Sequence, residues 1–311
     1  MVITKIHLPS EDIPSCHAST VVRVGNELLV AWFGGTKEAA EDVEIWCCRV
    51  SDGVASKPRR VSALDGVPCW NPVLYAPTDG PVTLFYKQGK SPSDWKTMVV
   101  TSTDRGNTWS APTELVPQDN SGGRGPVKNK PLLLPDGRLL APASVEQGQW
   151  SCFIDCLQDG EWTKHVIPLP AENPPQVIQP TLWQDADGGV HAIMRSNRGC
   201  VYRSDSADGG RTWCTVYPTA LPNNNSGIDC VALPDGRLFL VCNPVGKDWG
   251  ARTPLSLLVS TDNGETFSVF AELETGEGEF SYPAIIAGGD NRLYITYTWK
   301  RQDILLCEVY V

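Results

Sequence analysis

Residues that could do chemistry recur at one place in this chain, at the start of short apolar runs that have the pattern of strands. The residues at this place are all polar: Ser19, Asn71, Lys130, Gln179, Asp229 and Tyr282. His17 stands two residues before Ser19, and period-two alternation places both on the same side of a strand. A phenol, an imidazole and a carboxylate can act as nucleophile, general base or general acid. The set therefore predicts a site that carries acid and base groups.

Cationic residues lie close to the same positions or near the ends of the apolar runs that follow. They are Lys87, Lys128, Arg195, Arg252 and Arg301. The chain as a whole is acidic, with a formal net charge of −10. Because a guanidinium fork matches the two oxygens of a carboxylate, cations gathered in an acidic protein indicate an anionic ligand, most simply an acidic sugar. Polar residues at strand ends are also common in solvent, so each single position has a purely structural alternative.

Six stretches of similar design would position these residues. Each has an apolar strand that begins at one of the six polar residues, then a turn, then a second apolar strand. The turns are rich in Asp, Gly and Asn: Gly25-Asn26, Asp79-Gly80, Asp136-Gly137, Asp187-Gly188-Gly189, Asp235-Gly236 and Asp290-Asn291. Such turns between apolar runs are a strong signal for β-hairpins. The starts are 52, 59, 49, 50 and 53 residues apart, which indicates six equal units.

A second repeat supports the same period. The phrase Ser-x-Asp-x-Gly-x-Thr followed by an aromatic residue occurs at 102–109, 206–213 and 260–267, with aspartates 104 and 54 residues apart. Shorter remnants stand at 51–53 and 159–162. Ser and Asp side chains bond turn amides and Gly supplies an unusual φ, so we expect these phrases to be structural turns between outer strands.

Six units of about four short strands predict an all-β fold, a six-bladed β-propeller that forms a single domain over residues 1–311. A double-sheet sandwich is the alternative, but it would not require six equal periods. In a propeller blade the start of the first strand and the end of the second lie on the same face. We therefore expect the polar residues and the cations to line one pocket.

The repeated phrase is the Asp-box of sialidase-like β-propellers, and the whole chain resembles the predicted neuraminidases, or BNR-repeat sialidase-like proteins. The resemblance implies a propeller of sialidase type, with Tyr282 in Glu279-Phe-Ser-Tyr-Pro-Ala as the nucleophile. It implies that Arg195 and Arg252 are two members of an arginine triad that holds the carboxylate of the substrate. It also implies that Asp42 is the acid/base residue, with Glu38 and Glu41 as rivals.

The chain departs from the sialidase pattern at two places. Residues 15–19 stand where sialidases have the first arginine of the triad, and Lys130 or Lys128 is the available replacement. Gln179 occupies the place of the Glu that activates the tyrosine, and Asp229 or Glu279 is the available substitute. A phenol is a poor nucleophile at neutral pH without a neighbouring base.

Three functions are consistent with these residues. The first is a glycoside hydrolase that acts on a terminal acidic sugar or an acidic oligosaccharide, with Asp42 as acid and Tyr282 or Asp229 on the other side of the scissile bond. The second is a lyase that eliminates next to a uronic acid, with His17 and Tyr282 as the reacting pair. The third is a carbohydrate-binding propeller without catalysis. In the enzymes, we expect the substrate to contact Arg195, Arg252, Lys130, Gln179, Asn71 and Arg301.

Composition narrows the partners. The acidic charge disfavours a nucleic-acid partner, which needs a basic stripe, and no window is apolar enough to cross a membrane. The 11 cysteines are scattered without zinc-ligand spacing, which predicts buried reduced thiols, no metal and no cofactor. The N-terminus lacks the pattern of a secretory signal, which predicts a cytoplasmic protein. A secreted chain whose signal had been removed would show the same N-terminus. The sequence indicates no oligomeric state.

Overall fold

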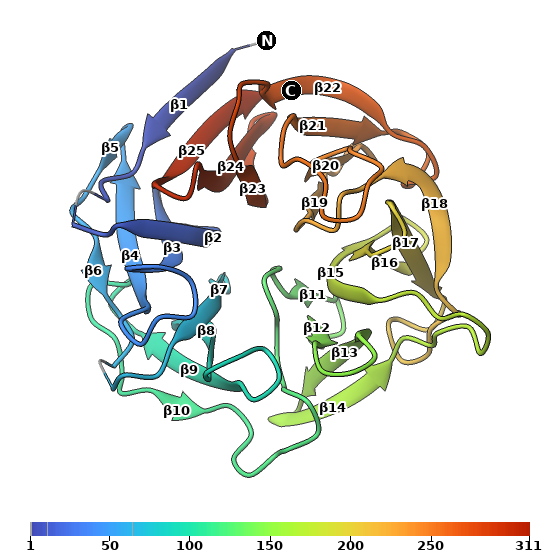
Figure 1. Ribbon diagram of the computed structural model, residues 1–311, viewed down its shortest axis with the longest axis horizontal. Helices are drawn as coiled ribbons and strands as arrows, with labels where there is room; N and C mark the ends of the chain where they lie inside the picture. The colour runs from blue at the N-terminus through green and yellow to red at the C-terminus, as the bar shows by residue number, and fades with distance from the viewer. Residues whose placement is uncertain (1, 11, 64) are drawn as a thin grey trace. The chain divides into compact units, whose positions relative to one another are not determined.

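The computed structural model describes residues 2–10, 12–63 and 65–311, and the regular elements of these ranges are all β-strands. They form six antiparallel sheets, five of four strands and one of five. The chain divides into two compact units with three sheets each (Figure 1). Unit 1 is Met1–Lys128 with Tyr282–Val311, and unit 2 is Asn129–Ser281.

Unit 1 holds the sheets of the first two repeats and of the last. The first sheet has β2 (Ser15–Val24), β3 (Glu27–Gly35), β4 (Glu44–Ser51) and β5 (Val54–Ala55), and β6 (Arg59–Arg60) pairs with β4. The second has β7 (Cys69–Tyr75), β8 (Val82–Gln88), β9 (Lys96–Ser102) and β10 (Thr113–Glu114). The third has β23 (Phe280–Gly289), β24 (Arg292–Trp299), β25 (Asp303–Tyr310) and, at its outer edge, β1 (Ile3–His7).

Unit 2 holds the sheets of the three middle repeats. The first has β11 (Leu132–Leu133), β12 (Leu139–Val145), β13 (Ser151–Gln158) and β14 (Glu161–Val166). The second has β15 (Val177–Gln184), β16 (Val190–Ser196), β17 (Cys200–Ser206) and β18 (Tyr217–Pro222). The third has β19 (Asp229–Ala232), β20 (Leu238–Cys242), β21 (Leu255–Ser260) and β22 (Ser268–Glu274).

The six predicted hairpins are confirmed. Each of the six Asp-, Gly- or Asn-containing turns joins the first two strands of its repeat, from β2 and β3 at one end of the chain to β23 and β24 at the other. The predicted outer turns are confirmed as well, because the three Asp-boxes connect β9 to β10, β17 to β18 and β21 to β22.

The second Asp-box shows how such a turn holds itself together. The carboxylate of Asp208 accepts hydrogen bonds from the Thr212 N–H at 2.9 Å, the Thr212 hydroxyl at 2.6 Å and the Ser206 hydroxyl at 2.8 Å. Gly210 has a φ of +83°, and a Cβ added there would lie 2.7 Å from Leu140. Only glycine meets both demands, which explains its place in the repeated phrase.

The apolar core lies between neighbouring sheets within each unit. In unit 1, Leu29, Ile45, Leu74 and Leu84 pack the first sheet against the second. In unit 2, equivalent layers place Leu140 and Met194 in one cluster and Ile193 and Leu240 in another. Burial of these aliphatic side chains provides the main favourable term for folding.

The cysteines are free and mostly buried, as the sequence predicts. Nine of the eleven are buried, Cys200 is half-buried, and Cys214 alone is exposed. Burial raises the pKa of the Cys242 thiol to about 12, so this residue stays a neutral, unreactive thiol. No helix in the described part of the chain is long and apolar enough to cross a bilayer.

Candidate functional site

The first strand of several repeats has a residue in the left-handed region at its third or fourth position. Tyr282 has a φ of +52°, and Ala18, Asn71 and Gln179 have values of +54°, +42° and +54°. At β2, β7 and β15 the pairing register with the next strand shifts at this residue, as in a β-bulge. Such conformations are costly for residues other than glycine, and bulges redirect side chains near active sites. The candidate residues of each unit are therefore set on a repeated irregularity of the backbone.

In unit 1, the structure brings His17 and Tyr282 together. Their ring centroids lie 4.2 Å apart with planes tilted by 47°. The His17 side chain is buried, and its Nδ1 lies 2.8 Å from the hydroxyl oxygen of Thr298 on β24. That oxygen accepts a hydrogen bond from the Ala18 N–H. If the Thr298 proton is donated to Nδ1, the proton of a neutral His17 resides on Nε2.

Asn71 is another predicted site residue of unit 1 that has a left-handed conformation. Its side chain is almost buried, and its amide has no hydrogen-bond partner among the described residues. Phe33, which is paired with His17 across β2 and β3, packs against Trp70, the neighbour of Asn71 on β7, with ring centroids 6.1 Å apart. The Asn71 side chain is thus a buried amide next to the Phe33–Trp70 contact in sequence.

Two predicted cations of unit 1 are occupied inside the protein. The Lys87 ammonium donates to the Thr97 hydroxyl at 2.5 Å and to the Arg124 carbonyl at 2.7 Å. The Lys128 ammonium donates to the carbonyl of Pro283. Both side chains are buried, so these contacts are structural, and Lys128 supports the backbone next to Tyr282.

The loop between β3 and β4 carries the predicted acid. Asp42 is exposed, and one oxygen of its carboxylate accepts hydrogen bonds from the N–H at 2.9 Å and the hydroxyl of Thr36. Its rival Glu38 forms an ion pair with Arg301 at 2.6 Å, whereas Glu41 is exposed. Arg301 therefore reaches this loop, which was not expected from its position after β24.

In unit 2, the structure brings Arg195 and Gln179 together. The buried Arg195 donates through Nε to Asn225 at 2.9 Å and through Nη1 to the Gln179 oxygen at 3.2 Å. The Gln179 amide nitrogen donates in turn to Glu146, also at 3.2 Å. Asn225 belongs to the 222–227 loop, whose residues Asn223, Asn224 and Ser226 are likewise buried. The guanidinium is thus held in a fixed orientation by amide groups.

Asp229 and Lys130 form an ion pair in the same unit, in which the Asp229 carboxylate is buried and the Lys130 side chain is partly exposed. The Lys130 ammonium lies 2.9 Å from each oxygen of the Asp229 carboxylate and 2.7 Å from the Cys230 carbonyl. The Thr181 hydroxyl donates to the same carboxylate at 2.7 Å. A role for Asp229 as a base, or for Lys130 as an anion binder, requires this pair to open.

Arg252 is the remaining predicted arginine. It forms an ion pair with Glu279 at 2.6 Å and lies 3.4 Å from the Ser281 hydroxyl oxygen. The Arg252 carbonyl accepts from the Phe280 N–H at 2.9 Å. The segment that leads into Tyr282 is therefore tied to Arg252 by both backbone and side-chain contacts.

Three residues join these clusters that were not among the predicted site residues. One is Thr298, which contacts His17. The others are Glu146, which contacts Gln179, and Asn225, which contacts Arg195. Thr298 and Glu146 stand at or just beyond the end of a second strand, a position where the sequence already predicts site residues. In the described ranges, no group of three or more His, Cys, Asp or Glu residues could hold a metal ion.

Comparison with known proteins places the chain among sialidase-like folds. A family model described as a BNR repeat-like domain matches residues 26–295, whereas no curated protein matches. A protein of unknown function from Dyadobacter fermentans DSM 18053 superposes with a TM-score of 0.81 at 16% identity, over 99% of both chains. Hadza microbial sialidase Hz136 gives 0.78 at 17% identity, over 96% of this chain and 66% of that one.

Trypanosoma rangeli sialidase gives a TM-score of 0.74 at 13% identity, over 99% of this chain and 59% of its own. The chain thus spans about two thirds or less of the length of these two sialidases. The predicted fold is confirmed: the protein is a six-bladed β-propeller of sialidase type.

Proposed function

The chain belongs to the BNR repeat-like domain family, and on this premise we propose that it is a glycoside hydrolase that acts on an acidic sugar. The observation that carries the proposal is the contact of Tyr282 with His17. A nucleophilic phenol needs a neighbouring group that can take its proton, and His17 is the imidazole next to Tyr282, with ring centroids 4.2 Å apart.

The left-handed conformation of Tyr282 supports the same assignment. A φ of +52° is a strained backbone conformation for an aromatic residue, and a strand does not require it. The residue is only half-buried, so its side chain is not sealed within the core. Strain of this kind is typical of residues that a binding or catalytic site holds in place.

In the proposed hydrolysis, the Tyr282 oxygen attacks the anomeric carbon while His17 accepts the phenol proton. Asp42 donates a proton to the leaving oxygen, and water then releases the sugar from the tyrosine. Arg195 and Arg252 are the proposed ligands of the sugar carboxylate. Arg195 suits this role because Asn225 and Gln179 fix the plane of its guanidinium before a ligand arrives.

Elimination is the second candidate, and the same pair of rings favours it. A lyase needs one group that removes the proton next to a uronate carboxylate and another that protonates the leaving oxygen. His17 and Tyr282 supply both groups from adjacent positions in unit 1. This route does not need Asp42, whose carboxylate is bonded to Thr36.

Product analysis distinguishes the two reactions. The purified protein is incubated with sialosides and with uronate-containing oligosaccharides, and products are followed by mass spectrometry and ultraviolet absorbance. Gain of one water per cleavage supports hydrolysis, whereas a new absorbing double bond without water supports elimination. Binding of these sugars with no turnover on either set would contradict both and indicate a binding propeller.

Variants then test the assigned residues. Tyr282→Phe removes only the hydroxyl, and we expect activity to fall by about 100-fold or more, as for the loss of a nucleophile or acid/base group. The matched control is Tyr75→Phe, at the turn end of β7, which should leave activity unchanged. Asp42→Ala abolishes the hydrolytic route and leaves elimination intact. Full activity in Tyr282→Phe would refute the assignment of Tyr282 in either reaction.

A further inference from the structure

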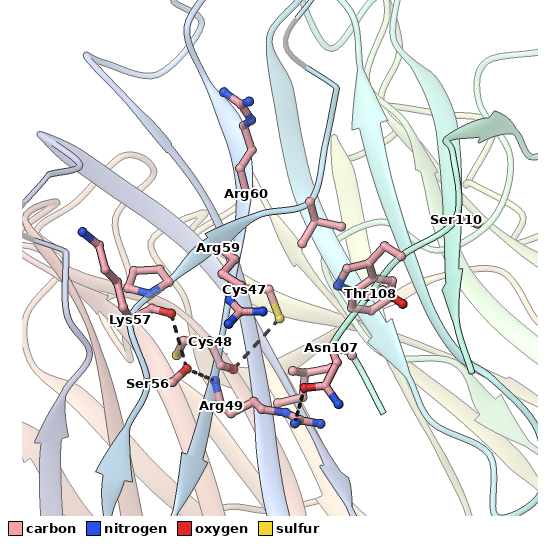
Figure 2. A pocket seen from close by; sticks show the side chains of 15 residues that line it. Cys47, Cys48, Arg49, Ser56, Lys57, Arg59, Arg60, Asn107, Thr108 and Ser110 are labelled. Carbon is pink, nitrogen blue, oxygen red and sulfur yellow. Dashed lines mark hydrogen bonds between the residues drawn. The ribbon is translucent and has the colours of Figure 1, made fainter. Parts of the chain in front are cut away.

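Unit 1 contains a hollow of about 550 Å³ that the proposed function does not use. One wall is the segment 56–61, which includes β6, and the opposite wall is the Asp-box turn 106–110 that follows β9 (Figure 2). Leu29 on β3 and the two cysteines of β4 line the rest. The size is in the range of small-ligand pockets.

The charge of the hollow is opposite to that of the protein. Its lining contains the cations Arg49, Lys57, Arg59 and Arg60 and no carboxylate, in a chain of net charge −10. A local cluster of this kind raises the local concentration of anions. The absence of any Asp, Glu or His from the lining also means that no general acid or base is present for catalysis.

Arg59 is the cation that is available to a ligand. It is exposed, and its side chain makes no hydrogen bond or ion pair with another described residue. Arg49, in contrast, already donates to Asn107 at 2.7 Å and to the Arg105 carbonyl, so it braces the Asp-box turn. Figure 2 shows Arg59 directed into the hollow toward Cys47, whereas Arg60, the next residue of β6, points away.

The indole of Trp109 differs from its counterpart in the second Asp-box. Trp213 is buried, and its N–H donates to the Gly210 carbonyl at 3.1 Å. Trp109 is half-buried, lines the hollow, and its N–H has no acceptor among the described residues. In the first Asp-box the indole of Trp109 therefore lines the hollow, and its N–H is a spare hydrogen-bond donor. In the second Asp-box the indole of Trp213 is buried and its N–H is bonded within the turn.

We propose that this hollow is a non-catalytic binding site for an acidic sugar of a glycan chain. The Arg59 guanidinium pairs with the carboxylate, and the Trp109 indole packs on the sugar and donates its N–H to a hydroxyl. The aromatic and aliphatic lining distinguishes a sugar from a bare inorganic anion, which would gain nothing from Trp109, Val61 or Leu29.

A second hollow suits the continuation of such a chain. It measures about 340 Å³, is lined by Trp46 and Ile13 among others, and shares Lys57 and Pro58 with the first. The Lys57 ammonium lies 3.3 Å from Asp12, but both side chains are about 80% exposed, so this pair is weak and can exchange for a ligand. An oligosaccharide could thus contact both hollows across the 57–58 segment.

Calorimetric titration of the full chain tests the site. The probes are a galacturonate hexamer and a sialic acid oligomer as acidic ligands, maltohexaose as neutral ligand and inorganic phosphate as bare anion. We expect an acidic oligomer to bind with an affinity that weakens as salt rises. Arg59→Gln should weaken this binding about tenfold, and Arg59→Glu should abolish it. Trp109→Phe keeps an aromatic ring but replaces the indole by a smaller phenyl group without the N–H, and should weaken binding several-fold.

The matched control is Arg211→Glu, which makes the same charge change at the exposed position of the second Asp-box that corresponds to Asn107. It should bind like wild type. Unchanged affinity in Arg59→Glu overturns the proposal, as does equal binding of maltohexaose. Phosphate that binds as tightly as the oligomers overturns the assignment to a sugar.

The same titration in Tyr282→Phe separates this site from the proposed function. Arg59-dependent binding in a protein that cleaves no glycan would refute the enzyme and leave the site. Turnover that depends on Tyr282, without Arg59-dependent binding, would do the reverse.

Discussion

Gln179 is a residue whose chemistry is explained by its two neighbours. Its side-chain oxygen accepts from Arg195 and its nitrogen donates to Glu146, both at 3.2 Å. An amide accepts at its oxygen and donates from its nitrogen, whereas an ionised carboxylate can only accept. The resemblance to sialidases treats Gln179 as occupying the position of a Glu, but here the amide has a defined structural role as a bridge between a cation and a carboxylate.

We expect Gln179→Glu to lower the free energy of unfolding by about 1–3 kcal/mol at neutral pH, because a buried donor is lost and two carboxylates meet. The loss should shrink near pH 4.5, where one carboxyl can be protonated and donate to the other. Urea unfolding at both pH values measures it. Gln147→Glu, on an exposed residue two positions after the end of β12 at Val145, is the control. Equal stability of the two variants would contradict the bridge.

Asp-box turns are elements that stabilise themselves locally, and their aspartates hold a single charge state. Hydrogen bonds from Thr212 and Ser206 keep the pKa of Asp208 well below its usual range. A lowered pKa means that the contribution to stability is complete above the ordinary carboxyl pKa of about 3.9 and is lost as the pH falls below it.

Asp208→Ala should therefore lower the free energy of unfolding at pH 7 by about 1–2 kcal/mol, as for the loss of a capping side chain. The difference from wild type should narrow below pH 3. Chemical unfolding across this range provides the measurement. Asp187→Ala, in the β15–β16 turn, removes an equally exposed carboxylate that is not part of an Asp-box. A similar loss in both variants would show that charge alone matters.

β15, β16 and β17 carry a second titrating arrangement, built on His191. Its Nδ1 lies 2.5 Å from Asp205 and its Nε2 lies 2.8 Å from Asp185, with Arg203, Tyr217 and Asn263 bonded to the same carboxylates. Burial lowers the pKa of His191, but the bonds to Asp205 and Asp185 raise it more, so it stays above its usual value. Burial raises the pKa of Asp205, and bonds from His191, Tyr217 and Arg203 bring it down to about 2.

A histidine whose pKa is higher in the folded state contributes its full stabilisation at pH values below its pKa in the unfolded state, about 6.5. This contribution is lost as the pH rises through the pKa of the folded state. We therefore expect His191→Gln to cost more stability at pH 5.5 than at pH 8.5. Denaturant unfolding of wild type and variant at the two pH values gives the difference. The control is His165→Gln, which removes a half-buried imidazole of the same unit that contacts the Arg211 carbonyl rather than a carboxylate. A constant cost for His191→Gln would exclude a charged His191.

These elements show what the sequence could and could not predict. Hairpin turns and Asp-boxes are local signals, and all of them were predicted correctly. The left-handed φ of Asn71, Gln179 and Tyr282 was not predicted, because each precedes a proline, which favours extended backbone. Partners such as Thr298 for His17, 281 residues away, depend on strand register and bulges that no local pattern specifies.

At the scale of the whole molecule, the first and last strands of the chain share one sheet. β1 pairs with β25 from Ile3 opposite Val309 to His7 opposite Leu305, and the Leu8 N–H then donates to the Ile304 carbonyl at 2.9 Å. The Leu8 side chain is 1% exposed and joins a core cluster with Trp32 and Leu306. The N-terminal strand is therefore an integral part of unit 1, fixed by both backbone pairing and apolar burial.

We expect Leu8→Ala to lower the free energy of unfolding by about 2–4 kcal/mol, because it leaves a cavity beside Trp32 that the sheet cannot fill. The melting temperature should fall with it. Val2→Ala shortens a side chain that is 61% exposed in the same segment, and it should change the melting temperature little. A small effect of Leu8→Ala, equal to that of Val2→Ala, would mean that β1 adds little to the sheet. A large and selective effect would show that unit 1 depends on the pairing of both chain ends.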